Sequence, residues 1–142
     1  MPDESDDVKA AIDHTVAHMS FIVRPIARHR LARTNHPPLH ITFGVRHDTV
    51  VVTLEHTNPI QTPRDGHAVP WASGVSSETY SASITFAGDT LRQLILASDG
   101  QRIDAFVFHE GGDRVDMHVT LSADRLPTPL VYTLTFRRTP AS

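Results

Sequence analysis

The chain has 142 residues, the size of a typical single domain, and its 39% hydrophobic and 20% charged residues exclude a disordered or fibrous protein. The net charge of −3 argues against nucleic-acid binding, because surfaces that bind nucleic acid carry an excess of lysine and arginine. Cysteine is absent, which excludes disulfides and thiolate chemistry.

The N-terminus is acidic and lacks the apolar region of a secretory signal. No apolar run in the sequence reaches the length needed to cross a bilayer, so we expect no integral membrane segment. The sequence therefore predicts a single cytoplasmic domain over residues 1–142, with residues 1–6 as a flexible tail. It does not determine the oligomeric state.

Residues 7–36 have the pattern of a helical segment. Apolar positions recur at Val8, Ile12, Val16 and Met19, which is the spacing of one helix face. Pro25 ends or kinks this helix and opens a second one, so we expect a helix–turn–helix segment that stops before residue 39.

From residue 39 to residue 138 the apolar period changes to two, which is typical of β-strands. Gly88-Asp89 and Asp99-Gly100 have the composition of tight hairpin turns, which join antiparallel neighbours. Residues 57–77 contain prolines and glycines and form a long connection with no clear strand. The clear strands cover residues 39–45, 50–55, 79–86, 90–98, 102–109, 114–122 and 130–138. A meander of this length favours closure into a β-barrel, which removes the exposed edges.

This order, together with the hairpin rhythm of residues 81–136 and the basic segment 26–33, resembles the intracellular fatty-acid-binding proteins of the calycin group. The resemblance implies a β-barrel around a lipophilic ligand. Two features of that family have no counterpart, namely its first strand and the Arg-x-Tyr pair that holds a ligand carboxylate. Leu134 and Phe136 occupy the positions of that pair, so the implied ligand is apolar or neutral, or the interior is filled by side chains.

Sorting the strand residues by face gives candidate ligand-binding residues. The faces assigned to the interior are almost entirely apolar and include Ile103, Ala105 and Val107. The outward-facing positions include three charged residues, Arg102, Asp104 and Asp116, and cross-strand ion pairs explain their presence there. Five polar residues share the inward phase, as expected for a cavity with a few placed polar groups: His56, Tyr80, Gln93, His109 and Tyr132. Ordinary half-buried side chains and strand-end positions explain the same five residues.

Two further clusters have a functional and a structural interpretation. His14 and His18 are one helical turn apart, a spacing that can hold zinc, but Thr15 replaces the glutamate of the H-E-x-x-H motif and no third ligand is identifiable. Chance pairing explains them, and we assign no metal site and no cofactor. The basic residues of the helical segment either contact an anionic membrane surface, an acidic partner or a phosphate, or form a solvated helix face: Arg24, Arg28, Arg30 and Arg33.

The sequence leaves three functions open. The first is binding of a small lipophilic molecule as a carrier or sensor. The second is a cyclase- or isomerase-type enzyme for a hydrophobic substrate, with His109, Tyr80 and Tyr132 as acid/base candidates, although no known catalytic motif is present. The third is a structural or protein-interaction domain. Trp71, in the proline-rich connection, either closes over a ligand or plugs the end of the barrel.

Overall fold

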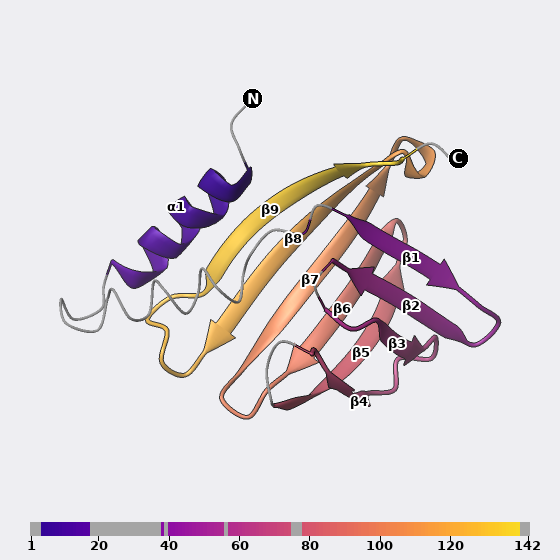
Figure 1. Ribbon diagram of the computed structural model, residues 1–142, viewed down its shortest axis with the longest axis horizontal. Coiled ribbons are helices and arrows are strands. Elements are labelled where there is room, and N and C mark those ends of the chain that lie inside the picture. Colours follow the sequence, from indigo (N-terminus) through magenta and orange to yellow (C-terminus); the bar gives the residue numbers. More distant parts are fainter. Residues whose placement is uncertain (1–3, 18–37, 39, 56, 75–77, 140–142) are drawn as a thin grey trace.

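The computed structural model describes residues 4–17, 38, 40–55, 57–74 and 78–139. These ranges form mainly β-structure in an antiparallel meander, as predicted (Figure 1). The helices are α1 (Glu4–Val16) and the short η1 (Glu110–Gly112). The strands are β1 (Ile41–Val45), β2 (Thr49–Leu54), β3 (Ile60–Pro63), β4 (Val69–Ala72), β5 (Thr79–Ala87), β6 (Thr90–Leu96), β7 (Gly100–His109), β8 (Arg114–Ala123) and β9 (Leu130–Arg137).

The described strands divide into two sheets. One has the order β1-β2-β3 and the other the order β4-β5-β6-β7-β8-β9, and every pair is antiparallel. Among these strands, no pairing joins β3 to β4 or β9 to β1, so closure into a calycin-like barrel stays a prediction.

β3 and β4 lie in the connection where the sequence pattern revealed no strand. Each has four residues, too few for alternation to stand out, and each contains a proline, Pro63 or Pro70. Trp71 therefore lies on a strand at the edge of the six-stranded sheet, opposite Tyr80, and not in a loop.

The helix begins at Glu4, inside the predicted tail. Val8, Ile12 and Val16 are its buried apolar residues, as the spacing predicted. Thr15 is also buried and its hydroxyl donates to the Pro129 carbonyl at 3.3 Å, which ties α1 to the turn before β9. The predicted second helix lies outside the described residues. Within those residues, no helix has both the length and the apolarity that crossing a bilayer requires.

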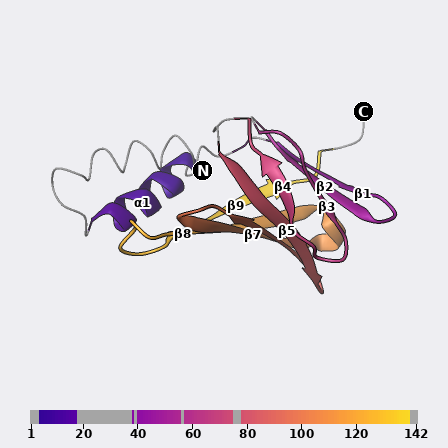
Figure 2. The same ribbon diagram turned by 90° about the horizontal axis from the view of Figure 1, so that it is seen from below.

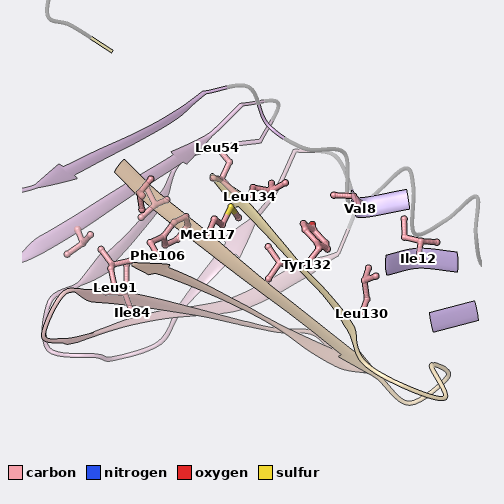
Figure 3. Packing of buried hydrophobic residues seen from close by; sticks show 14 of the residues in the cluster. Val8, Ile12, Leu54, Ile84, Leu91, Phe106, Met117, Leu130, Tyr132 and Leu134 are labelled. Carbon is pink, nitrogen blue, oxygen red and sulfur yellow. The ribbon is translucent and has the colours of Figure 1, made fainter. Parts of the chain in front are cut away.

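α1 and the three-stranded sheet lie on the same side of the six-stranded sheet (Figure 2). We call this side the covered face and the opposite side the open face. The main core lies between these layers (Figure 3). α1 packs along β9, and the ring of Phe43 of β1 is edge-on to the rings of Phe106 and Phe108 of β7, with centroid distances of 5.1 and 5.2 Å. The core residues of β6, β8 and β9 are Leu91, Val115, Met117, Val119, Leu130, Tyr132 and Leu134.

β7 presents the opposite face from the one predicted. Asp104 and Phe106 are fully buried, whereas Ile103, Ala105 and Val107 are only half-buried on the open face. Residues directly opposite in a ladder share a face, and β7 pairs its even-numbered residues with odd-numbered residues of both neighbours. Because β6 and β8 bury odd-numbered apolar residues, β7 must turn its even-numbered residues inward.

The turn between β6 and β7 is consistent with this pairing of odd-numbered residues of β6 with even-numbered residues of β7. The Ala97 amide donates to the Gly100 carbonyl at 2.9 Å, so Ser98 and Asp99 form the turn, one residue earlier than predicted. A two-residue turn at either position pairs odd residues of β6 with even residues of β7. The prediction that Ile103, Ala105 and Val107 face the interior was therefore incompatible with the inward Leu91 and Ile95.

Two alanine substitutions in neighbouring positions of β7 test this orientation. We expect Phe106→Ala to lower the free energy of unfolding by about 3–5 kcal/mol, because it leaves a cavity in the core. Val107→Ala on the open face should cost about 1 kcal/mol. Urea unfolding of both variants measures the difference, and an equal or reversed effect would contradict the assigned face.

Candidate functional site

The covered face carries one group of polar side chains, which we call the polar cluster: Gln93, Arg102, Asp104 and Tyr132. Gln93 and Asp104 are directly opposite each other on β6 and β7, and Val119 of β8 separates Asp104 from Tyr132 of β9 in the same cross-strand row. Arg102 lies two residues before Asp104 on the same face of β7. The sheet register alone therefore brings residues from three strands together.

Each carboxylate oxygen of Asp104 accepts one hydrogen bond within the cluster. Arg102 Nε donates to Oδ1 at 2.9 Å, and Gln93 Nε2 donates to Oδ2 at 3.1 Å. Arg102 also donates to the phenol oxygen of Tyr132. The Asp104 and Gln93 side chains are fully buried, whereas 21% of the Arg102 side chain is exposed.

The cluster is electrically balanced. Burial is the largest single effect on Arg102 and lowers its pKa, but the charge of Asp104 and the hydrogen bonds to Asp104 and Tyr132 together outweigh burial, so the pKa is raised. Burial raises the pKa of Tyr132, against the smaller opposing effect of the Arg102 cation, so this phenol stays protonated at neutral pH. Arg102 and Asp104 thus form a buried ion pair beside a neutral phenol.

One acceptor of the cluster is left over. Among the described residues, none donates to Gln93 Oε1, although this oxygen is buried. A carboxylate only accepts, so the amide nitrogen of Gln93 must face Asp104 and its oxygen must point away. An unsatisfied buried acceptor costs about 1–3 kcal/mol, which makes Gln93 Oε1 the atom of the polar cluster where a donor gains most.

On β5, β7 and β8, burial decreases along the covered face from the level of Gln93 toward the β6–β7 turn, whereas Leu130 on β9 stays fully buried. Arg102 lies opposite Leu121, which is half-buried. Beyond Ala82 on β5, Tyr80 and Trp71 are also half-buried, with ring centroids 5.8 Å apart, and Trp71 Nε1 donates to the Pro59 carbonyl at 3.2 Å. The polar cluster therefore meets solvent at this end through Arg102.

The structure separates the five residues predicted to bind a ligand. Gln93 and Tyr132 belong to the polar cluster, and Tyr80 lies on the covered face at its partly exposed end. His109 lies on the open face, where its Nε2 is 3.1 Å from Asp116 Oδ2, and His56 lies outside the described residues. Arg102 and Asp104 were predicted to face outward, and they join the cluster because of the parity of the β7 pairings.

The other candidate groups fall partly or wholly outside the described residues. Arg24, Arg28, Arg30 and Arg33 lie in the range 18–37, and so does His18, while His14 is exposed on α1. In the described ranges, no three side chains of histidine, aspartate or glutamate gather as metal ligands would.

No protein-family model matches the chain, and no curated protein sequence matches it. The resemblance to fatty-acid-binding proteins accordingly stays a prediction.

The energetic coupling within the polar cluster is measurable by a double-mutant cycle. Arg102→Met or Asp104→Leu alone leaves a buried charge without its partner, and each should cost about 3–5 kcal/mol in free energy of unfolding. The double variant removes both charges and should cost less than the sum of the two single changes by about 1–3 kcal/mol. Additive costs in urea unfolding would mean that the two charges do not interact.

Proposed function

We propose that this protein binds a small, mostly apolar molecule against the covered face of the six-stranded sheet, with the polar cluster as its anchor. The observation that carries the proposal is a single group of buried polar side chains on the apolar covered face, with one acceptor lacking a donor among the described residues. Ligand sites combine an apolar lining with a few placed polar groups in this way.

Stability alone is a weak reason for this cluster. Two charges lose their hydration when they are buried, and apolar residues of similar volume in their place are often neutral or stabilising. The buried pair of Arg102 and Asp104 is therefore poorly explained as a stabilising element, and a binding role accounts for the presence of charged residues at these two inward positions.

The partly exposed end of the covered face is the route by which a ligand would reach the polar cluster. Arg102 connects the buried cluster to solvent there, and the half-buried Trp71, Tyr80 and Leu121 supply apolar surface around it. Leu134 and Phe136 are apolar residues of the same face, in agreement with the neutral or apolar ligand that the family resemblance implies.

The enzymatic alternative receives less support from the geometry. It relies on His109, Tyr80 and Tyr132, but the sheet lies between His109 on the open face and Tyr132 on the covered face. These three side chains do not converge on one substrate position. The interaction alternative through the basic residues concerns a part of the chain outside the described residues.

A ligand screen tests the proposal. The purified protein would be mixed with a panel of lipophilic alcohols, acids, amides and sterols, and binding followed by native mass spectrometry and thermal shift. The wild type should retain at least one compound. The double variant Arg102→Met/Asp104→Leu should bind that compound at least roughly tenfold more weakly, because the anchor is gone.

Arg92→Met is the matched control for this screen. Arg92 is an exposed arginine on the open face of β6, so its replacement removes a positive charge without touching the covered face. It should bind like the wild type. The proposal fails if no compound binds the wild type, or if the double variant binds as tightly as the control.

A further inference from the structure

We infer that the molecule bound at the polar cluster is uncharged and carries a hydrogen-bond donor, a hydroxyl or an amide N–H, which it presents to Gln93 Oε1. This inference rests on the proposed function and adds the chemical class of the ligand. The inference excludes a carboxylate as the polar group of the ligand, although a carboxylate is the group that the fatty-acid-binding proteins hold.

The direction of the Gln93 amide sets the required partner. Its nitrogen donates to Asp104 Oδ2 at 3.1 Å, so its oxygen is the group that remains, and an amide oxygen accepts hydrogen bonds only. A ligand ether, ketone or carboxylate offers only acceptors and repels this oxygen. A hydroxyl or an amide N–H satisfies it.

The charge balance of the cluster opposes an anionic ligand. The carboxylate of Asp104 already neutralises Arg102, with an Nε to Oδ1 distance of 2.9 Å. A ligand carboxylate would place a second negative charge beside a fully buried Asp104 with no second cation on the covered face among the described residues. An arginine that already has its counter-ion is thus unlike the anchor of a fatty-acid carrier.

Four probes built on a ten-carbon chain separate these possibilities: decanol, decanamide, decyl methyl ether and decanoate. Binding to the wild type would be followed by the fluorescence of Trp71, the only tryptophan, which is half-buried at the partly exposed end of the covered face. Decanol or decanamide should bind roughly tenfold more tightly than the ether, because one buried acceptor becomes satisfied. Decanoate at neutral pH should bind more weakly than either donor.

Gln93→Met removes the acceptor while keeping the length of the side chain. Gln101→Met is the matched control, since Gln101 is a half-buried glutamine on the open face of β7. The preference for decanol or decanamide over the ether should disappear in Gln93→Met and persist in Gln101→Met. Circular dichroism verifies the fold of both variants, and if Gln93→Met does not fold, the wild-type comparison of donors with the ether decides.

The outcomes separate the two proposals. If the ether or decanoate binds the wild type as tightly as the donors, or if Gln93→Met keeps the preference, this inference is overturned while the proposed function stands. If none of the four probes and no compound of the wider panel binds the wild type, the proposed function fails and this inference fails with it.

Discussion

The orientation of β7 is set by its two neighbours rather than by its own composition. β6 and β8 bury odd-numbered apolar residues, and the register pairs each of them with an even-numbered residue of β7, as in Leu91 with Phe106 and Phe106 with Met117. A slip by one residue would move Phe106 and Phe108 away from Phe43 and expose two large rings. The same orientation buries Asp104, whose charge is balanced by Arg102 on the same strand.

The polar cluster follows from this constraint. Once Asp104 faces the interior, it needs donors, and Arg102 and Gln93 supply one to each carboxylate oxygen. Tyr132 accepts from the same guanidinium and, with its raised pKa, adds no charge. The balance is complete for charge but not for hydrogen bonding, because Gln93 Oε1 has no donor among the described residues. This unsatisfied acceptor is the physical basis of the proposed ligand site.

Periodicity predicted most of the fold. The structure keeps the apolar spacing of Val8, Ile12 and Val16. It also keeps the alternation of the longer strands after β1, because each of these elements buries one face. β3 and β4 were too short for alternation to show. The face of β7 was predicted wrongly because apolar residues lie on both of its sides, Ile103, Ala105 and Val107 on one and Phe106 and Phe108 on the other. Only the pairing parity with Leu91 and Ile95 distinguishes the two sides. The sequence singled out Gln93 and Tyr132 correctly as inward-facing polar groups, but Arg102 and Asp104 were missed for this same reason.

The central claim is that β7 turns Asp104 toward the covered face, where it is buried and contacts Gln93 and Arg102. Side-chain NOE spectroscopy of the folded protein tests this claim most directly. The account expects slowly exchanging side-chain amide protons of Gln93 with NOEs to Asp104, together with NOEs between the Phe43 and Phe106 rings, whose centroids are 5.1 Å apart. Rapid exchange of the Gln93 amide, with NOEs from the Phe43 ring to the methyl groups of Ile103 and Ala105 instead, would contradict it.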